Sequence, residues 1–241
     1  MKVRSGLVAA AVAATMFLGA GAAVAHADQG SDIATLARLG RVPAGQVKAA
    51  AQRTAQTQRR SVESVLSGWV KEAQTAKAAV ARARGNRVRG TSSASGDRPL
   101  GYALYRGDVF VSTSGFLWYG HTGIFVSSSS IVHAPGNGQN SVWVNSWNVM
   151  VGAGSVQDYV AASPASRDSA ANFAINHLRG KPYNLNFWDN HRVWASNYNC
   201  SQLVWAAYAG GSGIDLDGNG GSGVYPWDID ASGWTRTYRV Y

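Results

Sequence analysis

The chain has 241 residues, a formal net charge of +9 and a single cysteine, Cys200. This length fits one sizeable domain with a smaller addition, and a lone cysteine excludes any disulfide within the chain. Cys200 is therefore either a buried, inert thiol or a working thiolate, and composition alone leaves both interpretations open.

Residues 1–27 have the layout of a secretory signal peptide. Lys2 and Arg4 give a positive start, an apolar run follows from Gly6 to Val24, and small residues at 25 and 27 suit a signal peptidase. A membrane anchor is the weaker alternative, because the run is short for a span and ends in a cleavage site. The sequence therefore predicts a secreted protein, with association with the cell wall as a further possibility.

Residues 28–84 are expected to form a basic helical segment. Thirteen Lys and Arg residues stand against five Asp and Glu residues between positions 28 and 98, whereas residues 99–241 carry a net charge of −1. Apolar spacing predicts a short helix over 33–39 and one or two helices over 43–83.

The positive charge of this segment has two interpretations. It suits anionic cell-wall polymers or lipid head groups as partners, or it only keeps the protein soluble. Nucleic acid is not an expected partner, because the protein is exported and no recognition motif occurs.

Residues 85–98 read GNRVRGTSSASGDR, a linker without apolar periodicity, and residues 99–241 form the second predicted domain. Alternating β-branched residues with turns between them predict an antiparallel sheet there. Its expected strands are 107–113, 121–127, 130–134 and 141–147.

Two helices are expected after these strands. One covers 165–178 and is closed by Gly180, and the other begins at Cys200 and stops at Gly210 and Gly211. Strands followed by helices indicate an α+β fold.

Two histidines and the cysteine combine into a candidate catalytic site. His121 opens one strand and His133 is near the end of the next, so a hairpin between them places both at one end of the sheet. Cys200 begins a helix, where free N–H groups and a neighbouring imidazole would lower the thiol pKa. The set suggests a nucleophile, a base and an orienting residue, with the Cys200 N–H binding an oxyanion. Zinc is the rival use, but no closely spaced ligand pair occurs.

Five blocks around these residues resemble a known family, the NlpC-type cell-wall cysteine peptidases of the papain-like superfamily. The histidine blocks come first and the cysteine block last, an order similar to the circularly permuted branch, which includes YiiX-like bacterial proteins and the lecithin retinol acyltransferase group. The resemblance covers about residues 100–232 and implies a papain-like permuted NlpC-type domain, an antiparallel sheet packed on helices. The blocks are GDVF (107–110), GHTGIFV (120–126), IVHA (131–134), GKPYN (180–184) and NCSQLVW (199–205).

The resemblance also implies site residues. No cofactor is expected. The peptidases usually have Asp before the nucleophile and Gly two positions after it, where this chain has Asn199 and Gln202. These differences leave open whether a peptide, another amide or an ester is cleaved. The implied catalytic residues are Cys200 as nucleophile, His121 as general base and His133 as its orienting partner; the implied substrate-binding residues are Tyr183, Asn199 and Ser201.

The predicted function is that of a secreted thiol hydrolase that cleaves amide bonds in peptidoglycan stem peptides, or in another cell-envelope substrate, through a thioester. Two alternatives stay open at this point. The permuted relatives imply a lipid or ester hydrolase or an acyltransferase as one of them. The other is a non-catalytic module that binds the cell wall.

Two patterns near Cys200 have two interpretations each. Asp215, Asp217 and Asn219 begin like a calcium loop, but Pro226 stands where the loop needs Glu, which favours a simple glycine-rich turn. No metal is therefore expected. The aromatic segment around His191 either shapes the substrate site or only covers the core.

Overall fold

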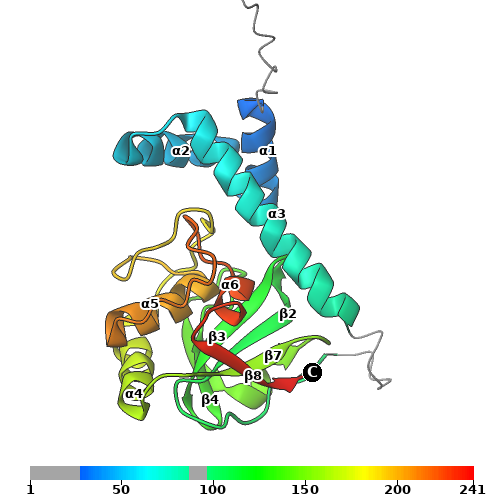
Figure 1. Cartoon of the computed structure of the whole chain (residues 1–241), viewed down its shortest axis with the longest axis vertical. Coiled ribbons are helices and arrows are strands. Elements are labelled where there is room, and N and C mark those ends of the chain that lie inside the picture. The colour runs from blue at the N-terminus through cyan, green and yellow to red at the C-terminus, as the bar shows by residue number, and fades with distance from the viewer. Residues whose placement is uncertain (1–27, 87–96) are drawn as a thin grey trace, which may run out of the picture.

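The computed structural model describes residues 28–86 and 97–241. A helical N-terminal part lies at one end of a domain that contains a sheet and further helices (Figure 1). The predicted signal peptide and most of the predicted linker lie outside the described residues. Within the part that the structure describes, no helix has the length and apolar character needed to cross a membrane.

The N-terminal part contains the expected short helix and two longer ones. Asp28 caps the first helix by accepting a hydrogen bond from the Gly30 N–H. The longer helical region is divided because Arg59 adopts a left-handed conformation with φ 53°, after which the Ser61 side chain accepts from the Ser64 N–H. The three helices are α1 (Gln29–Gly40), α2 (Ala44–Gln58) and α3 (Val62–Asn86).

The main sheet has six strands in the order β5-β4-β3-β2-β7-β8, and every neighbouring pair is antiparallel. Its first four strands in chain order occur where the sequence predicts them, whereas β7 and β8 were not predicted. A separate pair, β1 and β6, forms a two-stranded sheet. The strands are β1 (Arg98–Pro99), β2 (Val109–Leu117), β3 (Gly120–Ser127), β4 (Ser130–His133), β5 (Val142–Asn145), β6 (Met150–Val151), β7 (Val156–Val160) and β8 (Thr235–Val240).

The helices of this domain are α4 (Pro164–Phe173), which continues as a π-helix over Ala174–Leu178, then α5 (Cys200–Ser212) and α6 (Pro226–Asp230). The prediction that Gly210 and Gly211 end the cysteine helix is wrong. A Cβ on Gly210 would lie 2.5 Å from the Phe173 ring, so the glycine permits close packing of α5 on α4. The helix ends at Ser212 and is capped by Gly213, whose φ is 69°.

The two faces of the sheet have different cores. Val109, Val111 and Ile124 pack with residues of α4 and α5, whereas Phe110 and Phe125 pack with the segments around Leu100 and Val151. This alternation along each strand follows from the two-residue period of side chains. The mixed architecture confirms the predicted α+β fold, with an antiparallel sheet packed on helices.

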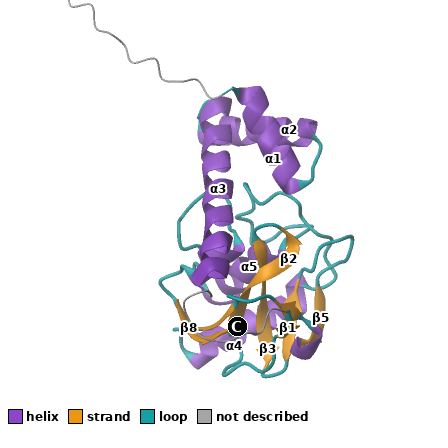
Figure 2. Ribbon diagram, turned by 90° about the vertical axis from the view of Figure 1, so that its right-hand side faces the viewer, coloured by secondary structure: helices purple, strands orange, loops and turns teal. Residues whose placement is uncertain are grey.

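A third core joins the N-terminal helices to the loops of the sheet domain. Leu36, Val47 and Trp69 of α1, α2 and α3 belong to the same buried cluster as Tyr225 and Cys200. Trp69 and Trp188 lie with their ring centroids 6.0 Å apart. Helices α1 and α2 therefore lie at the end of the domain where the cysteine helix begins, with loops between them and the sheet (Figure 2). The C-terminal part of α3 reaches the sheet itself, because Arg84 donates to the Thr113 carbonyl of β2.

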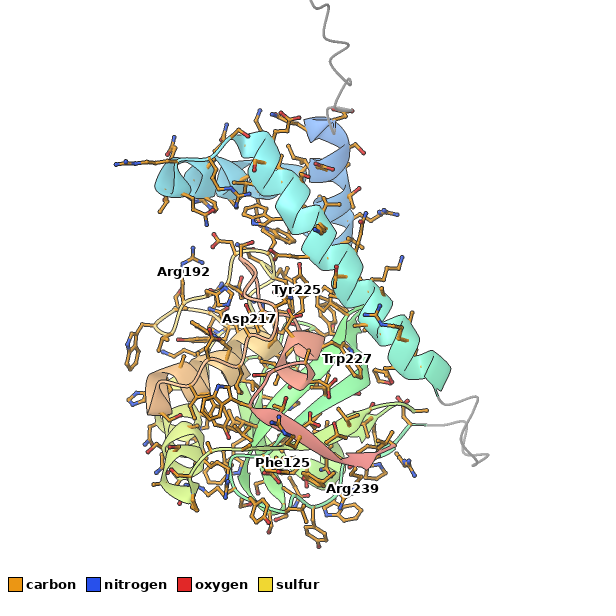
Figure 3. All side chains as sticks on the ribbon, viewed as in Figure 1. Phe125, Arg192, Asp217, Tyr225, Trp227 and Arg239 are labelled. Atoms are coloured by element: carbon orange, nitrogen blue, oxygen red, sulfur yellow. The ribbon has the colours of Figure 1, made fainter. Side chains whose placement is uncertain are left out.

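Glu72 of α3 adds hydrogen bonds to the contact between the N-terminal helices and the loops of the sheet domain. Its carboxylate accepts hydrogen bonds from the N–H groups of Ser222 and Gly223 at 3.0 and 3.2 Å, and from the Ser222 hydroxyl. Removal from water raises the pKa of this carboxyl despite these donors. Tyr225 and Asp217 lie in the loops that face α3 (Figure 3).

Candidate active site

The hairpin of β3 and β4 brings the two predicted histidines together. His133 pairs with Gly123, and Gly123 shares a strand face with His121, two residues earlier. Nε2 of His121 lies 2.7 Å from Nδ1 of His133, which is a hydrogen bond between the imidazoles. Both side chains are buried. The hairpin therefore places the two imidazoles as predicted.

Burial keeps both imidazoles neutral. It lowers the pKa of His133 to about 4, and burial together with the neighbouring His133 lowers the pKa of His121 well below its usual range. Because Nε2 of His121 is bonded to His133, Nδ1 is the ring nitrogen left to accept a proton. That role requires the tautomer in which Nε2–H of His121 donates to Nδ1 of His133.

Cys200 is the first residue of α5, and its side chain is 1 % exposed. The Thr122 N–H donates to the sulfur, which places the sulfur beside the backbone of the residue that follows His121. The N–H groups of Cys200 and Ser201 and the Tyr183 hydroxyl are further donors. Each of these donors favours negative charge on the sulfur.

The sequence-based expectation of a lowered thiol pKa is wrong for this structure. Burial raises the pKa of Cys200 to about 11, although the surrounding hydrogen-bond donors act in the opposite direction. The buried aromatic residues that pack in the same cluster explain this balance, because desolvation disfavours the thiolate. They are Trp69, Tyr119, Phe187, Trp188 and Tyr225. In this structure the thiol and both imidazoles are neutral.

Alkylation of Cys200 in the native protein is expected to accelerate with pH up to at least pH 9.5, because only the thiolate reacts and its pKa is about 11. In urea the thiol should titrate near its ordinary value of ~8.5. The measurement is the iodoacetamide rate from pH 6 to 10.5 in both conditions. A native rate that already levels off near pH 7 would contradict the account.

Tyr183 connects the thiol to a cavity. Besides donating to Cys200, its ring packs edge-on against Phe116 with centroids 6.0 Å apart. The same side chain lines a cavity of about 380 Å³ between α2 and the loop of residues 183–188. The implied role of Tyr183 in substrate binding stays a prediction.

Asn199 and Ser201 are placed differently from the substrate-lining role that the resemblance implies. Both side chains are fully buried. Asn199 caps α5 by accepting from the Gln202 N–H at 2.9 Å, and the Ser201 hydroxyl donates to the Val224 carbonyl at 2.6 Å. They therefore hold the start of the cysteine helix and do not face the cavity.

The candidate calcium loop forms a series of turns. Asp215 Oδ1 accepts from the Asp217 N–H and from the Trp205 indole N–H, and Asn219 Oδ1 accepts from the Gly221 N–H. Asp217 Oδ2 lies 3.1 Å from His191 Nε2. In residues 28–86 and 97–241, no group of three His, Cys, Asp or Glu side chains is arranged to hold a metal ion.

The residues of the aromatic segment around His191 differ in their placement, so neither interpretation, shaping the substrate site or covering the core, applies to the whole segment. Trp188 is buried and lines the cavity, whereas Trp194 is exposed and packs on Phe173. His191 joins Asp217 to the Ser222 carbonyl. Its side chain holds the loops together.

Two features of the site were missed by sequence reasoning. The first is the backbone N–H of Thr122. Its place in the GHTGIFV block can be read from the sequence, but its contact with the Cys200 sulfur cannot. The cavity wall that α2 provides depends on packing between distant segments, and the sequence contains no local signal for it.

Comparison with known proteins gives a family model and two relatives. The model described as "Permuted papain-like amidase enzyme, YaeF/YiiX, C92 family" matches residues 106–219, which include both histidines and the cysteine. The uncharacterized protein YycO of Bacillus subtilis (strain 168) is 31 % identical over 238 residues, covering 96 % of this chain and 94 % of that protein. A crystal structure of metalloprotein yiiX from Escherichia coli O157:H7 is similar with a TM-score of 0.40 and 16 % identity, over 57 % of this chain and 97 % of the other.

Proposed function

Because the chain belongs to the permuted papain-like amidase family and is therefore a cysteine peptidase or amidase-type hydrolase, we propose that it is exported and cleaves amide bonds of peptidoglycan stem peptides. In this proposal Cys200 is the nucleophile, His121 the base and His133 its orienting partner. The observation that carries the assignment is the 2.7 Å bond between His121 Nε2 and His133 Nδ1, which leaves Nδ1 of His121 for a proton.

The reaction begins with a neutral thiol and a neutral imidazole. His121 Nδ1 takes the thiol proton while Sγ of Cys200 attacks the carbonyl carbon of the substrate amide. The resulting oxyanion is bound by backbone N–H groups at the start of α5. The protonated His121 then gives its proton to the departing amine, and a thioester remains on Cys200.

The second half of the reaction releases the acyl group. A water molecule takes the place of the departed amine. His121 accepts a proton from this water while the water oxygen attacks the thioester carbonyl. When the carbon–sulfur bond breaks, His121 returns the proton to sulfur and a carboxylic acid leaves. His133 keeps the His121 ring in its reactive orientation in both halves, because it accepts the Nε2–H bond throughout.

The setting at the cell wall rests on two sequence features. The first is the secretory pattern of residues 1–27. The second is the excess of positive charge over residues 28–84, which suits anionic wall polymers or anionic lipid surfaces. Both features favour an enzyme held near its polymeric substrate.

Digestion of purified peptidoglycan tests this function. The mature protein is expected to release new amino and carboxyl ends from stem peptides, detected by mass spectrometry, and the release should disappear when Cys200 is replaced. Acyl esters are assayed in parallel. Turnover of esters without turnover of wall peptides would favour the lipid or ester hydrolase instead, and no turnover of either would remove the proposal.

A further inference from the structure

The cavity of about 380 Å³ beside Tyr183 lies within the size range of small-ligand sites. One wall is the loop of residues 183–188, which belongs to the sheet domain. The opposite wall is α2, which lies outside the segment matched by the family model. The cavity is therefore built jointly by the catalytic domain and the N-terminal helices.

Four residues of α2 line this cavity from one helix face. Gln46, Ala49, Ala50 and Arg53 are spaced i, i+3, i+4 and i+7, which aligns them along the helix. The two alanines leave room for a bound chain, while Gln46 and Arg53 supply N–H donors. This face of α2 is thus suited to contact a polar ligand.

Positive charge at the cavity is unpaired. Among the lining residues in the described part of the chain, Arg53 is the one with a charged side chain, and it forms no ion pair with another described residue. The nearby Asp189 is already engaged, because Arg192 forms a salt bridge to it and Thr54 of α2 donates to its Oδ2. Arg192 extends from its loop toward α2 in Figure 3.

The other polar groups of the cavity are mainly side-chain amides. Asn184 is held by Gln202 and by the Asn186 N–H, and Asn186 Oδ1 accepts from the Asp189 N–H. These bonds occupy the Asn186 acceptor and leave its NH2 group available as a donor. Amide donors together with a guanidinium match the oxygens of a carboxylate.

We propose that this cavity binds a carboxylate-bearing part of the substrate and that Arg53 of α2 is its specificity-determining residue. Tyr183 lines this cavity and its hydroxyl is a hydrogen-bond partner of the Cys200 thiol, so the proposed carboxylate site and the sulfur have this side chain as a common neighbour. The inference rests on the proposed function in one respect, namely that the substrate is a peptide. It adds that the basic helical segment takes part in recognition.

Binding and hydrolysis are measured separately to test this inference. The binding probes are a stem peptide with free carboxylates and the same peptide with each carboxylate converted to a carboxamide, titrated by calorimetry into the full-length Cys200→Ala protein. The carboxylate form is expected to bind about tenfold more tightly, the size of one charge-assisted contact at a partly open site. Arg53→Gln should abolish this preference, and Arg53→Lys should retain part of it.

Lys48→Gln is the matched control, because it removes the same charge from an exposed position of α2 that does not line the cavity. It should leave the preference unchanged. Equal binding of the two peptides, binding of neither, or equal effects of Arg53→Gln and Lys48→Gln would overturn the inference. If binding depends on the carboxylates but the protein that retains Cys200 hydrolyses no peptide, the proposed function alone is contradicted. If the peptides are hydrolysed but binding does not depend on their carboxylates, this inference alone is contradicted.

Discussion

Replacing Cys200 by alanine is expected to lower the rate of amide hydrolysis by at least ~10⁴-fold, because no thioester can form without the sulfur nucleophile. Cys200→Ser should also be severely impaired, since a hydroxyl holds its proton far more tightly than a thiol. The measurement is kcat/KM on peptidoglycan fragments for the three proteins. Activity within tenfold of the original in Cys200→Ala would contradict the assignment.

The control for the two Cys200 variants must distinguish loss of the nucleophile from loss of the folded structure, because Cys200 is buried in a packed cluster. Ser212→Ala changes another small side chain at the opposite end of α5, where the hydroxyl donates to the Tyr208 carbonyl. This variant should keep the original rate. Circular dichroism and thermal unfolding of all the variants show whether the fold is retained.

His121→Ala is expected to lower kcat by about 10²- to 10⁴-fold, the usual range for a lost general base. The loss should exceed that of most other single changes because the Cys200 thiol, with its pKa raised to about 11, is protonated at neutral pH and needs an acceptor. Added imidazole offers a second check, since a small base can enter the space left by the side chain and restore part of the rate.

His133 is a positioning residue, and its variants separate position from basicity. His133→Ala removes the acceptor of the His121 Nε2–H bond, so the rate should fall by ~10- to 100-fold. His133→Gln keeps an acceptor oxygen and should retain most of the activity. If the two variants lose activity equally, the orienting bond is not what His133 contributes.

The fold was predictable where the local sequence pattern of a segment matches its burial in the folded structure. The strands that carry His121 and His133 alternate clearly, and the turn of serines between them fixes the hairpin that joins the imidazoles. β7 and β8 were missed for a physical reason. Asp158 sits buried within β7 and Arg236 and Arg239 lie in β8, so neither strand shows a simple apolar period.

The chemistry at Cys200 was less predictable than its position. Its place at a helix start follows from the sequence and favours a thiolate, but the net effect depends on how much water reaches the sulfur. Cys200 is buried in one cluster with Phe187 and Tyr225, which lie 13 and 25 residues away in the chain, and with residues of helices α1 to α3. Only the assembled structure brings these segments into one core with the thiol.

The central claim is that an acyl group passes from the substrate to Cys200. It is tested most directly by mixing the mature protein with peptidoglycan fragments, quenching with acid during turnover, and measuring the mass of the peptide that contains Cys200. We predict an added acyl mass on Cys200 that hydroxylamine removes and that is absent from Cys200→Ala. Rapid hydrolysis with no such adduct, or an adduct on another residue, would contradict the account.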